Sequence, residues 1–268
     1  MKNYIEIDDV GKQCKFIDGR FYLSPSGRWL PGYTEVMSVI SKGSHYERFL
    51  MSNGFNAQII AREAMEQGSK VHHAIEQFLK DNPVEIKERE DGTYNYTEEE
   101  WKRISKFMDF YAEFQPEVIG VESVMASDNL GYGSQLDLIC RMPIFDNQLI
   151  YIDHKTGGLY DTVDMQLAAS AMLWNSTYPD LPIQMVAVLH LDAQTRGRDK
   201  KGKNIQGKGW KLEIYEDYAK SFNDFQHVFA IWKRKNPDFK PMNVTLPASY
   251  NQKMFKEGFK FNNEINEK

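Results

Sequence analysis

The chain has 268 residues, a formal net charge of −5 at pH 7, and 41% hydrophobic and 13% aromatic residues. This length suits one large domain or a domain with an appendage, and the apolar content excludes a chain that is disordered throughout. The acidic balance argues mildly against a general nucleic-acid binder, although basic residues can still gather on one face.

The amino-terminal sequence MKNYIEIDDV lacks the basic-then-apolar pattern of a signal peptide. The longest apolar runs, such as residues 185–189, are far too short to span a bilayer. The only two cysteines, Cys14 and Cys140, have no paired spacing, which favours a reducing compartment. We therefore expect a cytoplasmic protein of a bacterium or an infected host cell, without a membrane partner.

Residues 1–32 are predicted to form a hairpin appendage of short strands, with turns at Gly19 and at residues 24–27. A hairpin that only caps the domain is the interpretation that the pattern favours. A clamp for nucleic acid is the alternative, and it would act through Arg20, Arg28 and Trp29. Residues 33–240 would then form the main domain and residues 241–268 a polar carboxyl-terminal tail.

Helical periodicity follows in two stretches. Thr34 is the expected N-cap of the first, at residues 35–42. The second covers residues 45–50 and then residues 56–65. Gly68 is expected to interrupt this pattern.

Ser69 would cap or continue the next helix, which is predicted to end near Leu79. His72 lies on this helix and is either a metal ligand or an ordinary structural histidine. The neighbouring His73 points elsewhere and is expected at the surface.

A polar, acidic stretch at residues 81–100 predicts a surface excursion. Thr97 is expected to cap the next helix through a capping box, and that helix would run from Glu98 to about Phe114. Its apolar stripe indicates packing against a core. A strand at residues 118–126 follows.

Two apolar runs, at residues 136–140 and 149–152, predict buried strands that are joined by a polar turn, as in a hairpin. Asp137 lies on the first strand, and Asp153 and Lys155 lie at the end of the second. Charged residues are scarce inside strands because burying an unpaired charge costs several kcal/mol. Two acids and a lysine on one hairpin therefore indicate a function.

A divalent cation is the chemical explanation that these residues favour. Two carboxylates on adjacent strands can bind a hard cation such as Mg²⁺ or Mn²⁺ and leave several positions to water. The cation would polarise a phosphoryl oxygen and lower the pKa of a bound water. Lys155 is two residues from Asp153 and shares its face, so the ammonium could orient or deprotonate that water and offset charge on the phosphate.

The remaining elements alternate between helix and strand, which indicates an α/β fold with a mixed sheet flanked by helices. They are a helix at residues 163–174, a buried strand at 183–191, a strand at 211–215 and an amphipathic helix at 218–233. Gln166 lies in the first turn of the first of these helices.

The segment at residues 195–211 has seven basic side chains and one acid, and it is predicted to form an extended hairpin loop. The basic residues are Arg196, Arg198, Lys200, Lys201, Lys203, Lys208 and Lys211. Such a run is commonly solvated surface. Its sign and its glycines also fit a flexible finger that contacts phosphates without sequence preference, and we favour this function because the rest of the chain is acidic.

Five of these features together resemble the PD-(D/E)xK nuclease superfamily. Asp137, then Asp153-His154-Lys155, then Gln166 follow its order, and the RecB-like exonuclease branch, which includes phage-encoded members, is the most similar. That branch has a Gly-x-x-x-His signature upstream, which Gly68-Ser69-Lys70-Val71-His72 matches. It also has an acidic residue on the strand before the hairpin, where this chain has Glu122.

The resemblance spans residues 30–232 and implies a restriction-endonuclease-like core with helical amino-terminal additions. It implies a Mg²⁺- or Mn²⁺-dependent deoxyribonuclease, with an exonuclease as the favoured form. Such an enzyme would leave 5′ phosphates and act in DNA recombination, repair or phage DNA processing. Single-stranded DNA or duplex ends would be its substrate, with a recombination or single-strand-binding protein as a further partner. Polarity, the choice between exonuclease and endonuclease, and the oligomeric state stay open.

The resemblance also assigns roles to individual residues. The implied metal ligands are Asp137, Asp153, the backbone carbonyl of His154, His72 and Glu122. Glu122 could equally hold a ligating water or make only a structural hydrogen bond. Lys155 would position the attacking water, and Gln166 would orient the lysine or a phosphate, unless it is an ordinary polar residue of a first helical turn.

The chain departs from the family pattern in two places. The branch often has Gln-x-x-x-Tyr after the lysine, whereas Gln166 is followed by Ser170, which puts the details of strand contact in question. Some relatives carry an iron–sulfur cluster held by four cysteines, and two cysteines exclude that cluster here.

Two other functions compete with the nuclease. A catalytically silent DNA-binding or recombination partner would keep the same fold. A hydrolase of a non-nucleic phosphate ester would keep the metal site, but the basic run at residues 196–211 favours a long polyanion as its ligand.

Overall fold

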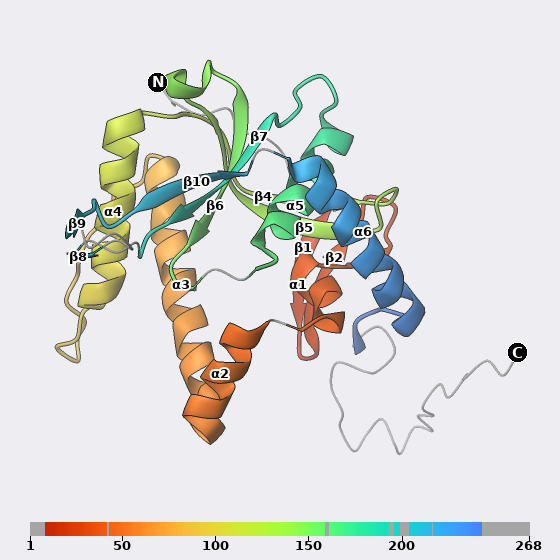
Figure 1. Ribbon diagram of the computed structural model, residues 1–268, viewed down its shortest axis with the longest axis horizontal. Coiled ribbons are helices and arrows are strands. Elements are labelled where there is room, and N and C mark those ends of the chain that lie inside the picture. Colours follow the sequence, from red (N-terminus) through yellow and green to blue (C-terminus); the bar gives the residue numbers. More distant parts are fainter. Residues whose placement is uncertain are drawn as a thin grey trace, which may run out of the picture.

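The computed structural model describes residues 9–41, 43–158, 161–192, 196–198, 204–215 and 217–242. A five-stranded mixed sheet lies at its centre, with the strands in the order β10-β7-β6-β5-β4 (Figure 1). These strands are β4 (Glu117–Ser127), β5 (Tyr132–Arg141), β6 (Leu149–Lys155), β7 (Met185–His190) and β10 (Lys211–Tyr215). All neighbours are antiparallel except the β6–β7 pair, which is parallel. The predicted hairpin of β5 and β6 is confirmed, and so is the α/β fold class.

Helices cover both faces of the sheet (Figure 1). Helices α5 (Val163–Thr177) and α6 (Tyr218–Lys235) pack on one face, and α3 (Ala57–Leu79) and α4 (Glu98–Phe114) pack on the other. Along β6, Leu149 and Tyr151 belong to the first core, whereas Ile150 and Ile152 belong to the second. A strand that is buried on both faces is apolar at consecutive positions, which explains the unbroken run in this segment.

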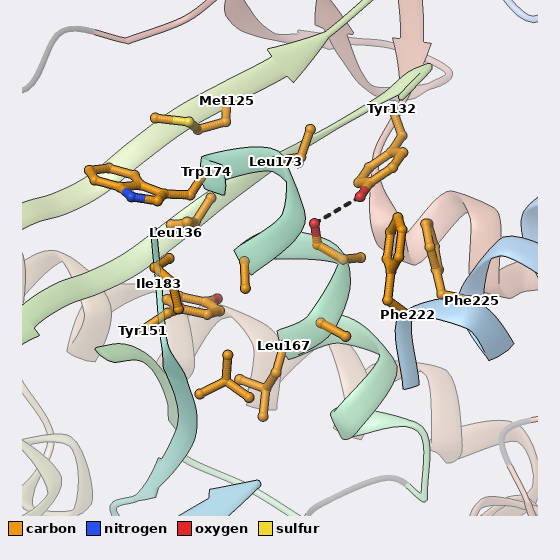
Figure 2. Packing of buried hydrophobic residues seen from close by; sticks show 14 of the residues in the cluster. Met125, Tyr132, Leu136, Tyr151, Leu167, Leu173, Trp174, Ile183, Phe222 and Phe225 are labelled. Carbon is orange, nitrogen blue, oxygen red and sulfur yellow. Dashed lines mark hydrogen bonds between the residues drawn. The ribbon is translucent and has the colours of Figure 1, made fainter. Parts of the chain in front are cut away.

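The core beneath α5 and α6 is largely aromatic. Figure 2 shows Trp174 of α5 beside the sheet, and Phe222 and Phe225 of α6 close to Tyr132 of β5. The hydroxyl of Tyr132 donates a hydrogen bond of 2.8 Å to the carbonyl of Ala169, so its one polar atom is satisfied. This packing holds α5, and therefore Gln166, against the sheet.

The capping box predicted for α4 is confirmed. The Thr97 side chain accepts a hydrogen bond from the backbone of Glu100, and the Glu100 carboxylate accepts one from the backbone of Thr97. Gln115, in a left-handed conformation, ends the helix.

Two predictions about the amino-terminal helices are wrong. Gly68 does not interrupt the pattern, because α3 continues through it for 23 residues. A glycine inside a helix costs about 1 kcal/mol relative to alanine, which long helices with good packing tolerate. Thr34 is not an N-cap either: α1 (Tyr33–Val36) begins after Gly32, is only four residues long, and is followed by a 3₁₀ turn.

Helix α2 (Ser44–Asn53) and the beginning of α3 form a helical hairpin that precedes the site in the sequence. Helix α2 is joined to α3 by a 3₁₀ turn at Gly54–Asn56. Helix α2 and the beginning of α3 extend away from the sheet (Figure 1).

The amino-terminal hairpin has a third strand. Strands β1 (Lys12–Phe16), β2 (Gly19–Leu23) and β3 (Trp29–Pro31) form an antiparallel sheet that packs against β4 and β5. Tyr22 lies so close to Gly133 of β5 that a Cβ there would come within 2.4 Å of its ring. Arg28 forms an ion pair with Asp128, and Trp29 packs on Phe16 and Phe21. These contacts are those of a cap; the domain boundary at residue 32 stays a prediction.

The basic segment does form a hairpin between β7 and β10. Strands β8 (Arg196–Arg198) and β9 (Asn204–Gln206) pair antiparallel. Lys200, Lys201 and Lys203 lie outside the described residues, as do residues 1–8 and 243–268. In the described part of the chain, no helix is both long and apolar enough to cross a membrane.

Candidate metal centre

Strands β5 and β6 bring Asp137 and Asp153 together. Leu138 pairs with Ile152, so the next step of the antiparallel register places the two aspartates opposite each other. The backbone amide of His154 donates a hydrogen bond of 2.8 Å to Asp137 Oδ2. Asp137 is only 8% exposed and Asp153 only 3%, so both carboxylates require a nearby positive charge.

Helix α3 supplies one such charge, His72. Its Nε2 donates to the carbonyl of His154 at 3.1 Å, which leaves Nδ1 facing the carboxylates. Nδ1 lies 3.5 Å from Asp137 Oδ2 and 3.5 Å from Glu122 Oε1. His73, the next residue, is exposed as predicted, and it forms an ion pair with Glu76.

Gly68 explains how α3 comes so close to the end of β6. It lies one turn before His72, and a Cβ at this position would be 3.1 Å from Thr156 Oγ1, which directly follows β6. Gly68 and His72 therefore lie on the part of α3 that meets the end of β6, and a side chain at position 68 would need Thr156 to shift by a few tenths of an ångström.

Glu122 completes the acidic group in a strained backbone. It lies between the paired residues Val121 and Ser123 of β4, on the strand next to Asp137. Its φ is 50°, a left-handed value that is uncommon for a side-chain-bearing residue and rare inside a strand. Such outliers persist only where surrounding structure compensates, and they cluster at functional sites.

Lys155 and Gln166 form a closed network with Asp153. Lys155 Nζ is 2.7 Å from Asp153 Oδ2 and donates to Gln166 Oε1 at 3.0 Å. Gln166 Nε2 donates in turn to Asp153 Oδ1 at 3.0 Å. The three side chains therefore contact one another, and Gln166 is hydrogen-bonded to both Lys155 and Asp153.

The electrostatics follow from this crowding of carboxylates. Burial alone lowers the pKa of His72, but Asp137 and Glu122 outweigh it and raise that pKa to about 9. Burial raises the pKa of Asp137 to about 7, against the opposite effect of His72 and with a contribution from Asp153. At neutral pH the protonated His72 therefore offsets part of the negative charge of these carboxylates.

Sequence reasoning missed two residues of this site. The hydroxyl of Tyr151 donates to Asp153 Oδ1 at 3.3 Å, and the ring of Phe107 on α4 packs edge-on against His154 at 5.2 Å. The two-residue period of the strand could have indicated Tyr151, because it shares a face with Asp153. No local signal indicates Phe107.

Two further residues from the sequence analysis are Lys208, a candidate phosphate contact, and Ser170, which stands where the family often has tyrosine. Lys208 forms an ion pair with Glu113 and lies over the ring of Trp210 at 5.0 Å. Ser170 is fully buried and shares a 3.0 Å hydrogen bond with Ser134. It packs inside the core and does not reach the surface.

The donor set fits a divalent cation. The ligand atoms of His72, Asp137 and His154 all lie within 4.8 Å of one another, and two imidazole nitrogens with a carboxylate oxygen could together hold a divalent cation. Both ring nitrogens of His154 are buried without a hydrogen-bond partner among the described residues.

Neither a protein-family model nor a curated protein matches this chain. The case for a function therefore depends on the site itself.

Proposed function

We propose that this protein is a metal-dependent DNA nuclease of the PD-(D/E)xK type that hydrolyses phosphodiester bonds and leaves 5′ phosphates. The observation that carries the proposal is that Asp137, within β5, lies on the strand next to Asp153 and Lys155 at the end of β6, and that Lys155 is hydrogen-bonded to Gln166. Burying two carboxylates and a lysine costs several kcal/mol unless they serve a purpose, and this grouping suits cleavage of a phosphate ester.

Asp137, Asp153, His72 and Glu122 would hold Mg²⁺ or Mn²⁺. The bound cation would supply Lewis-acid activation of the phosphodiester and of the attacking water. The carbonyl of His154 accepts a hydrogen bond from His72 and therefore fixes which nitrogen of that ring faces the carboxylates.

Lys155 would position the attacking water. Its ammonium donates a hydrogen bond to Gln166 and forms an ion pair with Asp153, so its direction is set before substrate binds. A positive charge held in this way orients the water and offsets the negative charge that develops on phosphorus, without reorganisation during the step.

The basic hairpin supports a long polyanion as substrate. The backbone amide of Leu191 donates to the carbonyl of Lys155 at 2.8 Å, so the segment that leads into β8 starts beside the catalytic lysine. Basic residues in the segment that follows Leu191 would suit contacts with the phosphates of a long polyanion.

Cleavage of end-labelled single- and double-stranded DNA with Mg²⁺ or Mn²⁺ tests the proposal. We expect wild-type protein to cleave, Lys155→Ala to lose about 10²- to 10³-fold in rate, and Asp137→Asn at least as much. Lys102→Ala, which removes an exposed lysine of α4, is the matched control. Wild-type cleavage rates in both site variants would refute the site, and DNA binding without turnover under either metal would instead support a silent binding protein.

A further inference from the structure

His154 is buried in a way that its packing alone does not explain. It is 2% exposed, and both of its ring nitrogens lack a hydrogen-bond partner in the part of the chain that the structure describes. A buried polar group without a partner costs about 1–3 kcal/mol. A phenylalanine would pack against Phe107 equally well without this cost.

The ring of His154 lies on the opposite side of β6 from Lys155. Side chains alternate along a strand, so Asp153 and Lys155 face α5, whereas His154 faces α3 and α4. There its ring is 5.8 Å from that of His72, at an angle of 64°. His154 Nδ1 is 4.0 Å from Asp137 Oδ2, the same oxygen that faces His72 Nδ1.

These three donors are spaced as ligands of one ion. Two ligand atoms that are each about 2.1 Å from the same cation lie no more than about 4.2 Å apart. The donors of His72, Asp137 and His154 all lie within 4.8 Å of one another, so small side-chain rotations suffice. His72 also has the feature expected of a metal-bound histidine, because its other nitrogen donates to a backbone carbonyl.

We propose that the imidazole of His154 is a metal ligand together with His72 and Asp137, and that the centre therefore prefers a first-row transition cation to Mg²⁺. Imidazole nitrogen suits Zn²⁺, Co²⁺ and similar ions, whereas Mg²⁺ takes oxygen ligands and retains its water. This proposal rests on the proposed function in one respect, namely that these side chains form a metal centre. It adds the cation that the centre prefers and the atoms that bind it.

Metal titration of purified protein tests this without any substrate. Co²⁺ and Mg²⁺ are titrated calorimetrically into wild type, His154→Phe and the control His73→Phe, and the visible absorption of bound Co²⁺ is recorded. His154→Phe keeps the ring against Phe107 and the backbone carbonyl but removes both nitrogens. His73→Phe changes an exposed histidine on α3 that lies outside the site.

We expect His154→Phe to weaken Co²⁺ binding by about tenfold or more and to change its absorption, with little effect on the affinity for Mg²⁺. His73→Phe should match wild type in both. An unchanged Co²⁺ affinity and spectrum in His154→Phe would overturn the proposal while leaving the nuclease intact. Failure of wild type to bind any divalent cation would overturn both.

A second measurement applies if His154→Phe does not fold. Wild-type protein with ¹⁵N-labelled histidine is titrated with Zn²⁺, and the ring-nitrogen resonances of the two buried histidines are followed. Shifts in both His72 and His154 support the proposal. A shift confined to His72 contradicts it.

Discussion

The two sides of the metal centre differ in how their polar groups are satisfied. On the side of α5, Asp153, Lys155 and Gln166 bond to each other at 2.7–3.0 Å. On the side of α3, His72 lies 3.5 Å from its two carboxylates, and the ring of His154 has no hydrogen bond among the described residues. The first side is held by closer contacts than the second, although Asp153 Oδ2 has an ion pair with Lys155 and no hydrogen bond among the described residues.

In the proposed nuclease, this difference would separate two tasks within one site. A network that is already closed positions its lysine before substrate binds, which avoids reorganisation during the reaction. A set of donors that faces inward without full partners is stabilised when a cation arrives, because metal binding then contributes to folding free energy. Changes on the first side should therefore affect rate, and changes on the second should affect cation binding.

The largest effect is expected where the two sides meet. Asp153→Asn removes a predicted ligand and the ion-pair partner of Lys155 in one substitution. We expect the cleavage rate at saturating Mn²⁺ to fall about 10³-fold, against about tenfold for Glu122→Gln, which changes the α3 side only. Both substitutions keep side-chain volume. Equal losses in kcat for the two variants would contradict the division of tasks.

Gln166→Leu should separate rate from metal binding. It removes the hydrogen bonds to Lys155 and Asp153 but no predicted ligand. We expect kcat to fall on the order of 10- to 10²-fold, because a misplaced catalytic group costs this much, while the calorimetric affinity for Mn²⁺ changes little. Gln148→Leu, at an exposed position of the same hairpin, is the control. A loss that appears in metal affinity alone would assign Gln166 to the other side.

Gly68→Ala should move stability and activity in opposite directions. Alanine is favoured over glycine in a helix by up to about 1 kcal/mol, so the free energy of unfolding should rise or hold. The new Cβ would lie 3.1 Å from Thr156 Oγ1 and displace the end of β6 from α3, so cleavage should fall several-fold. Ser69→Ala, on the same helix but exposed, serves as the control. A variant that gains stability without any loss of activity would show that the close approach is not needed.

The smallest effect is a pH dependence confined to the α3 side. A histidine whose pKa rises from 6.5 to about 9 on folding stabilises the metal-free protein below pH 6.5 and loses that contribution as pH rises to 9. The raised pKa of Asp137, about 7, acts in the same direction between about pH 4 and pH 7.

The melting temperature without metal should therefore decline from pH 6.5 to 9, and His72→Asn should flatten this slope. Added Mn²⁺ should raise the melting temperature more at pH 8 than at pH 6, because the cation competes with a proton for the same site. A metal-induced shift that is larger at pH 6 would contradict this competition.

Much of the fold was predictable because it depends on local pattern. Buried strands appear as apolar runs, and both ends of α4 follow from its capping box and from the change in pattern after Phe114. The shared face of Asp153 and Lys155 follows from the two-residue period of a strand. The third strand of the amino-terminal sheet was not predicted, because residues 29–31 are too few to show a period.

The candidate site was predictable in its members but not in their arrangement. Sequence order and residue type pointed to Asp137, Asp153 and Lys155, since charges in buried strands are costly. No local sequence pattern indicated the left-handed backbone of Glu122. None indicated that the ring nitrogens of His154 have no hydrogen-bond partner among the described residues. Both depend on neighbours that are supplied by other elements.

By itself, the sequence determined most strands and helices of the central sheet layer and marked Asp137 and Asp153 as charged residues of buried strands, because these follow from periodicity and from the cost of burial. Only the tertiary structure decided that His72 reaches His154 across 82 residues of chain, that Gly68 faces Thr156 at the end of β6, and that the ring nitrogens of His154 have no hydrogen-bond partner among the described residues. Contacts between distant segments arise from the packing of whole elements, and no short stretch of sequence encodes them.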